Sequence, residues 1–153
     1  KGTSERITLY EIKSVIGESL VARKHNELVK DGIKWTRVSA SKDLTVGKKL
    51  EFELEGKDIL VFRFQDEVRA IQNTCTHMNL PLSGGEVNDM GYITCPFHGT
   101  SYCTHEGTVQ KWCDGLPEDM PPENVKMMMS MKQVPLTIYS VIDYEDSIWV
   151  AMT

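Results

Sequence analysis

The chain has 153 residues, of which 41% are hydrophobic and 25% charged, so it is long enough to fold as one domain with a buried core. Its formal net charge of −5 argues against nucleic acid as a partner, and no apolar run reaches the roughly eighteen residues of a membrane-spanning helix. The acidic residues are concentrated in one part, because residues 1–34 hold seven Lys/Arg and five Asp/Glu, whereas residues 35–153 hold ten and seventeen.

The first 34 residues are predicted to form a helical extension. Apolar residues between positions 5 and 31 recur at roughly helical spacing: Leu9, Ile12, Val15, Ile16, Leu20 and Leu28. Gly17 interrupts this pattern, and Gly32 is a suitable C-terminal stop. We expect the helix either to cover an open edge of the following domain or to dock a partner.

From Trp35 the apolar pattern changes to the period of β-strands. Residues 35–40, 49–54, 58–64 and 68–72 alternate or form short β-branched and aromatic runs. Turn-like segments separate them, and further short strands are expected at 101–104, 108–112, 134–143 and 148–152. Short strands at this spacing predict a small antiparallel sandwich or barrel.

Four potential metal ligands follow the strand that ends at residue 72. Cys75 and His77 form a Cys-x-His motif, and Cys95 and His98 form a Cys-x-x-His motif, with seventeen residues between the motifs. Two thiolates and two imidazoles in matched pairs suit a metal centre, because each tight loop delivers two donors to one side of it. A zinc site is one alternative, although zinc motifs usually place two cysteines in one short loop and two histidines in another. Two further alternatives are that Cys75 and Cys95 form disulfides, or that all four residues are unliganded members of the core.

Residues 115–133 are predicted to be an irregular insertion, because Pro117, Pro121 and Pro122 prevent regular structure through its first half. Four methionines lie between positions 127 and 131. Their flexible side chains favour either packing against the sandwich or docking of a partner.

The two Cys/His motifs resemble those of Rieske proteins. Gly84-Gly85 between the motifs, Pro96 within the second and Gly99 after it support this resemblance, which extends from about Trp35 to the C-terminus. It implies an all-β fold: an antiparallel β-sandwich over residues 35–153 with a small cluster-binding subdomain, whose loops span about residues 74–102. The predicted N-terminal helix would precede this domain.

The resemblance also implies one [2Fe–2S] cluster per chain. Cys75 and Cys95 would hold the inner iron, and His77 and His98 the outer iron, with both histidines at the protein surface. Two ferric ions, two sulfides and two thiolates sum to zero formal charge, so the oxidised cluster is neutral and easier to reduce than an all-cysteine cluster. The expected potential therefore lies at about −150 to +300 mV.

Four further positions bear on that potential. High-potential Rieske proteins carry a disulfide between the two loops, but Leu80 and Phe97 occupy those positions here, which indicates the low-potential ferredoxins and oxygenase domains. Thr100 and Tyr102 fall where high-potential members place hydroxyls that bond to cluster sulfur and to a ligand thiolate, which raises the potential. Both are also ordinary strand residues. We expect an intermediate potential, on the low side.

The expected function is one-electron transfer, from a reductase to a terminal oxygenase or a similar acceptor. Catalysis is not expected, since only His25 and His105 remain for a second iron, and no dinucleotide motif, activated nucleophile or small-molecule substrate site is evident. A fixed Rieske subunit of a larger oxidoreductase and a structural zinc module are the alternatives. The partners would be redox proteins, and Cys103 and Cys113 would be free thiols in a reducing cytoplasm.

Overall fold

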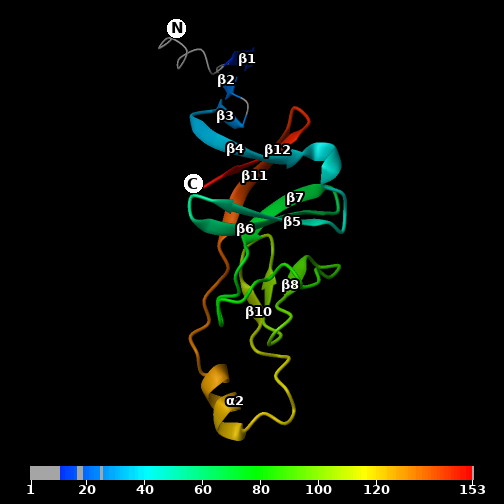
Figure 1. Ribbon diagram of the computed structural model, residues 1–153, viewed down its shortest axis with the longest axis vertical. Helices are drawn as coiled ribbons and strands as arrows, with labels where there is room; N and C mark the ends of the chain where they lie inside the picture. The colour runs from blue at the N-terminus through cyan, green and yellow to red at the C-terminus, as the bar shows by residue number, and fades with distance from the viewer. Residues whose placement is uncertain (1–10, 17–18, 25, 153) are drawn as a thin grey trace. The chain divides into compact units, whose positions relative to one another are not determined.

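The computed structural model describes residues 11–152 except 17, 18 and 25. Within these residues the secondary structure is mainly β, with one α-helix and one short 3-10 helix, η1 (Ser41–Asp43) (Figure 1). The chain divides into two compact units, one made of residues 1–45 and 139–153 and the other of residues 46–138.

The first unit is an antiparallel sheet with its own small core. Its strands lie in the order β1 (Glu11–Ile16), β2 (Ser19–Lys24), β3 (Glu27–Lys30), β4 (Ile33–Ala40), β12 (Ser147–Ala151) and β11 (Ile138–Tyr144). Leu28, Trp35, Trp149 and Ala151 are buried together. Leu28 and Trp35 are cross-strand partners, so the β3–β4 hairpin presents its apolar residues to the core.

The predicted N-terminal helix is wrong for the residues that the structure describes. Strands β1, β2 and β3 lie within the stretch from 11 to 30, while residues 5–10, 17, 18 and 25 of the predicted helix lie outside the described residues. Asp31 and Gly32 have φ of 56° and 78° and join Lys30 to its partner Ile33. Asp-Gly with two positive φ angles makes a two-residue hairpin turn, so Gly32 turns a hairpin and does not end a helix.

The second unit contains the predicted central strands. β5 (Lys49–Leu54), β6 (Lys57–Phe64) and β7 (Glu67–Gln72) form an antiparallel sheet with β6 in the middle. The residues at the turn between β5 and β6, Glu55 and Gly56, have φ of 52° and 78°, as a tight hairpin requires. The bounds agree with the sequence prediction to within one residue.

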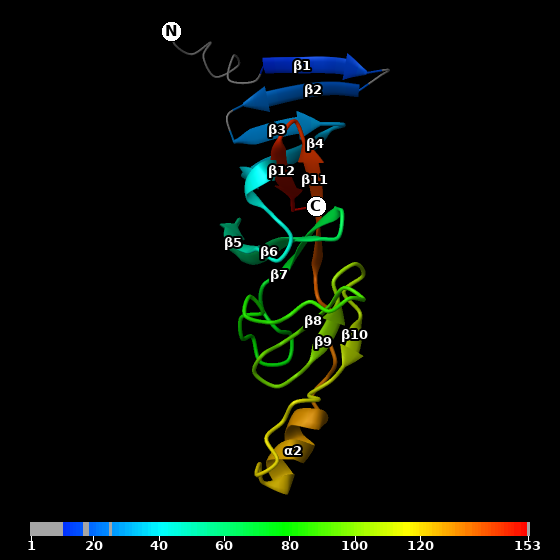
Figure 2. The same cartoon turned by 90° about the vertical axis from the view of Figure 1, so that its right-hand side faces the viewer.

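A second, smaller sheet carries the loops that hold the four candidate ligands. β8 (Tyr92–Thr94), β9 (Ser101–Cys103) and β10 (Val109–Lys111) are antiparallel in the order β10-β9-β8. In both views they lie between the β5–β7 sheet and the α-helix (Figures 1 and 2). The core of this unit contains residues from both sheets and from the loops: Leu60, Phe62, Ile71, Cys75, Leu82, Ile93, Cys95, Tyr102 and Leu136.

The predicted irregular insertion at 115–133 contains a helix, α2 (Pro122–Met129). Proline at the first helical position sacrifices no intrahelical hydrogen bond, because that N–H has no partner in any helix, so Pro122 starts this helix. Met128 is its buried residue and packs with Trp112 and Cys113. The neighbouring Met127 and Met129 are exposed, so the methionine stretch is part packing and part surface.

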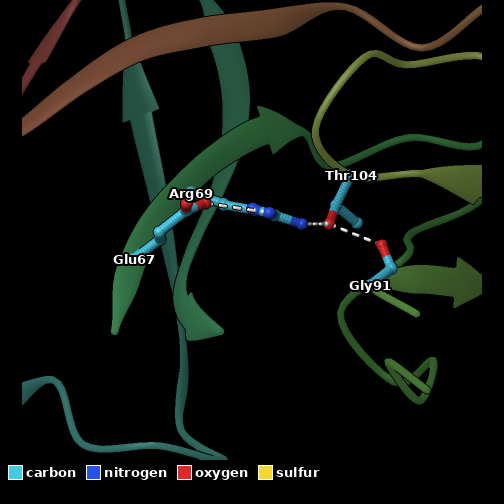
Figure 3. Close-up of polar contacts among 4 residues, drawn as sticks. All are labelled: Glu67, Arg69, Gly91 and Thr104. Carbon is cyan, nitrogen blue, oxygen red and sulfur yellow. Dashed lines mark hydrogen bonds and ion pairs between the residues drawn. The ribbon is translucent and has the colours of Figure 1, made fainter. Parts of the chain in front are cut away.

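Arg69 connects the two sheets of the second unit. From β7 its guanidinium donates to the Thr104 hydroxyl at 2.9 Å and to the Glu67 carboxylate at 2.9 Å (Figure 3). The Thr104 hydroxyl in turn donates to the carbonyl of Gly91 at 2.6 Å, just before β8. Arg69 also lies over the ring of Phe64, and only 13% of its side chain is exposed. These bonds hold the small sheet against β7.

Replacing Arg69 is therefore expected to loosen the unit. Arg69→Met removes charge-assisted hydrogen bonds at a largely buried site and should lower the free energy of unfolding by about 1.5–3 kcal/mol in urea denaturation. Lys111→Met, which removes an exposed ion pair of 3.7 Å with Asp114, should cost at most about 1 kcal/mol. In a double-mutant cycle with Thr104→Val, Arg69→Met should show coupling. Additive effects would contradict the proposed connection.

Candidate metal centre

The two ligand loops share one backbone design. In the first, the Cys75 N–H donates to the Leu80 carbonyl and the Asn79 N–H donates back to the Cys75 carbonyl, both at 2.7 Å. In the second, Cys95 makes the matching bonds with Thr100 at 2.8 Å and with Gly99 at 3.1 Å. The fifth residue of each loop has positive φ, 57° at Asn79 and 80° at Gly99. Each loop thus begins at a cysteine and folds back on it.

This design brings the two cysteines together in the core. Both are 2% exposed and belong to the same core cluster. The Cys95 thiol, the Tyr102 hydroxyl and the backbone N–H groups of His77 and Met78 lower the pKa of Cys75 to about 5, although burial opposes them. Burial and the neighbouring Cys75 raise the pKa of Cys95. The thiolate is the form that binds metals, so Cys75 is prepared for a metal ion.

The two histidines form a second pair. The rings of His77 and His98 meet edge to face, with centroids 5.5 Å apart. The sequence predicted both histidines at the surface, and for His77 this is wrong, because only 3% of it is exposed. Trp112 covers it, with the ring centroids 4.9 Å apart, and His98 is partly exposed. The physical reason is tertiary packing of Trp112 and Cys113, which follow β10, against the His77 ring.

Tyr102 contacts the first loop at three points. Its hydroxyl lies 3.2 Å from the sulfur of Cys75, accepts the N–H of Thr76 at 3.0 Å and lies 2.8 Å from the Thr76 hydroxyl. Thr76 donates its own proton to the carbonyl of Val134 at 2.6 Å, so its oxygen can only accept from Tyr102. The single proton of Tyr102 is therefore shared between Thr76 and Cys75.

Thr100, the other hydroxyl predicted to tune the cluster, contacts Cys113. Its hydroxyl accepts the backbone N–H of Cys113 at 3.0 Å and lies 4.0 Å from the Cys113 sulfur. Cys113 itself lies against His77, 36 residues away in sequence. No motif in the sequence marks Cys113 or Trp112 as neighbours of the candidate ligands, because both meet His77 only through tertiary packing.

The donor set fits a binuclear iron–sulfur cluster. Two soft thiols lie side by side in the core and two imidazoles lie together, so each iron can take one pair, as in a Rieske cluster. Over the described residues, no three His, Cys, Asp or Glu side chains converge on one ion position. The loops also approach closely: a Cβ on Gly85 would collide with the Thr94 carbonyl, and one on Gly99 with the backbone of Gly115.

The comparisons with known proteins agree with this site. The Rieske [2Fe-2S] domain family matches residues 34–126, and the chain belongs to this family. The chain is 30% identical over 118 residues to the ferredoxin CarAc of Metapseudomonas resinovorans, an alignment that covers 76% of this chain and 92% of that protein. It is similar in structure to the ferredoxin of carbazole 1,9a-dioxygenase from Nocardioides aromaticivorans IC177, with a TM-score of 0.60 and 25% identity over 78% and 98% of the two chains.

A longer relative shares the same region. The chain is 29% identical over 117 residues to chlorophyllide a oxygenase of Arabidopsis thaliana, an alignment that covers 76% of this chain. It spans only about a fifth, 19%, of that protein's length. The part of the chain that the structure describes forms no helix with the length and apolar character to cross a membrane.

The adjacent glycines between the loops provide a matched test of this close approach. Gly85→Ala should cost about 1–3 kcal/mol of stability and lower the iron content of the purified protein, because the new methyl group would push Thr94 and the second loop away. Gly84→Ala is the control, since its nearest neighbour would be the side chain of Pro96 at an ordinary 3.7 Å. Equal iron content and equal melting temperature in the two variants would show that the loops adjust freely.

Proposed function

We propose that this chain carries single electrons between redox proteins through one [2Fe–2S] cluster and performs no catalysis of its own. The observation that carries the proposal is the pairing within the site: two buried thiols on one side and two imidazoles on the other, supplied by two loops of the same design. When bound, the cluster would accept and release one electron at a time.

In this proposal Cys75 and Cys95 hold the inner iron, and His77 and His98 hold the outer iron. The cysteines belong to the hydrophobic core, which excludes water from their sulfurs. The edge-to-face histidines belong to the same two loops and so present one donor pair to the second iron. Tyr102 supports the Cys75 thiolate through its hydroxyl. Thr100 supports the site through Cys113.

The proposed partners are a reductase as electron donor and a terminal oxygenase, or a similar acceptor. A solved complex joins the oxygenase and the ferredoxin of carbazole 1,9a-dioxygenase, and this chain is 27% identical to one of its chains, with a TM-score of 0.59. A fixed place within a larger oxidoreductase is the second candidate, which the similarity to part of a chlorophyllide a oxygenase favours. The mass of the native protein in a cell extract distinguishes the two.

Two finer assignments belong to the same proposal. We assign residues 35–153 to the Rieske domain and residues 1–34 to an extension, which the start of the family match at residue 34 supports. We place the protein in the cytoplasm, a compartment in which thiols stay reduced. None of the four cysteines forms a disulfide in the structure, and that state suits such a compartment.

A redox titration of the purified protein tests the proposal. We expect a Rieske-type EPR signal on reduction and a one-electron potential in the lower part of the range of about −150 to +300 mV. Cys75→Ser and His98→Ala should each abolish the signal. Cys103→Ser and His105→Asn, in the same subdomain but outside the site, should retain it. A colourless protein that contains zinc, or a signal that survives loss of Cys75, would overturn the assignment.

The shared proton of Tyr102 predicts potential shifts of opposite sign. Tyr102→Phe removes the hydrogen bond to the Cys75 sulfur and should lower the potential, because that bond stabilises the more negative reduced state. Thr76→Val removes the competing acceptor and should raise it. Each shift should be about 1 kcal/mol, or roughly 40 mV for a one-electron couple.

Thr100→Ala is the control for these two variants. Its hydroxyl faces Cys113, so its shift should be smaller than that of Tyr102→Phe. Shifts of the same sign for Tyr102→Phe and Thr76→Val in redox titrations would contradict the sharing of one proton.

A further inference from the structure

The two candidate histidine ligands differ in their access to solvent. His77 is 3% exposed and lies against Trp112 and Cys113, whereas His98 is partly exposed and its neighbour Phe97 is 50% exposed. The two loops have the same backbone hydrogen bonds, so the difference comes from what covers them. The cover over His77 consists of Trp112 and Cys113, which follow β10, and Met128 of α2 packs with both of them.

Cys113 makes the closest contact in this cover. Its sulfur lies 3.1 Å from Nε2 and 3.6 Å from Nδ1 of His77, so it is in direct contact with the imidazole ring. The same sulfur lies 3.7 Å from the carbonyl of Met128 in α2. The side chain is 4% exposed, and burial raises the pKa of the thiol. Because this buried thiol lies between the His77 imidazole and the Met128 carbonyl, it restricts rotation of the His77 ring.

The backbone around Cys113 is arranged to present this thiol. Its φ is 54°, a conformation that non-glycine residues seldom adopt, and its N–H is bonded to the Thr100 hydroxyl at 3.0 Å. Thr100 itself closes the second loop. Strained backbone persists where the surrounding structure determines it, and here the second loop holds Cys113 against the histidine of the first.

We propose that Cys113 and Trp112 close the His77 side of the metal centre, so that electrons enter and leave through His98 alone. This proposal rests on the assignment of both histidines as ligands of the outer iron. Cys113 is then a positioning residue: it holds the His77 ring and excludes water from Nε2, and it binds neither iron nor partner. Exchange with a redox partner takes place on the face where His98 and Phe97 are accessible.

Chemical labelling of the oxidised, cluster-loaded protein tests this asymmetry. Diethyl pyrocarbonate acylates accessible imidazole nitrogens, and peptide mass spectrometry locates the adducts. We expect labelling of His98 and of the exposed His105, which checks the reagent, and protection of His77. Labelling of His77 in the wild-type protein, or absence of label on His98, would overturn the proposal.

Variants of the cover provide the second measurement. Cys113→Gly suits the positive φ and removes the thiol, so it should abolish the protection of His77, which should then label at the rate of His98. Trp112→Ala should have the same effect. Met129→Ala, at an exposed position on α2, should leave His77 protected. Continued protection in both Cys113→Gly and Trp112→Ala would show that these residues do not form the cover.

The same samples separate this inference from the proposed function. A wild-type protein without the Rieske EPR signal contradicts the proposed function itself. A loaded protein in which both histidines react contradicts only the closure of the His77 side. If a variant fails to load the cluster, the labelling pattern of the wild-type protein still decides whether His77 is closed.

Discussion

The structure of the second unit depends on the convergence of two cysteine-led loops on one small volume. Four donors can meet there only if both loops fold back tightly, and each does so through reciprocal backbone bonds to its cysteine. The approach leaves no room for side chains where Gly85 meets Thr94 and where Gly99 meets Gly115. The cysteines are also members of the hydrophobic core, so the fold and the site use the same contacts.

The sheets around the two ligand loops hold the loops in position. β8 lies between the two loops in the chain, and β9 follows the second, so any movement of this small sheet would separate the donor pairs. Arg69 prevents such movement from the β7 side through Thr104 and Gly91. On the other side, the N–H of Leu136 is bonded to the carbonyl of Gly107 at 2.8 Å, which fixes the segment that follows the insertion. The small sheet is therefore held at two places: at Gly91 and Thr104, next to β8 and β9, and at Gly107, just before β10.

The central strands and the ligand loops could be predicted from the sequence, because local residue patterns determine both. Strands β5, β6 and β7 follow from alternation and their turns, and the ligand loops follow from motif spacing. The N-terminal prediction failed because apolar spacing alone was read as helical, when the Asp31-Gly32 pair already indicated a hairpin. The burial of His77 could not have been predicted, since it depends on a contact with Cys113 across 36 residues. Such contacts come from tertiary packing, which leaves no periodic signal in the sequence.

The segment after β10, which includes the insertion, contacts the ligand loops, although its composition does not indicate this role. The residues just before the insertion, Trp112 and Cys113, lie against His77, and just beyond its end the carbonyl of Val134 accepts the hydroxyl proton of Thr76. Both contacts are made to the first ligand loop. The segment between them includes α2, whose Met128 packs on Trp112 and Cys113. The segment from Trp112 to Val134 thus contacts the first loop at two points, whereas His98 and Phe97 of the second loop are partly exposed and exposed. The segment after β10 also contacts the second loop, through Cys113 at Thr100 and through Gly115 at the His98 carbonyl. The two loops of the same backbone design differ in environment because Trp112 and Cys113 lie against His77, whereas His98 stays partly exposed.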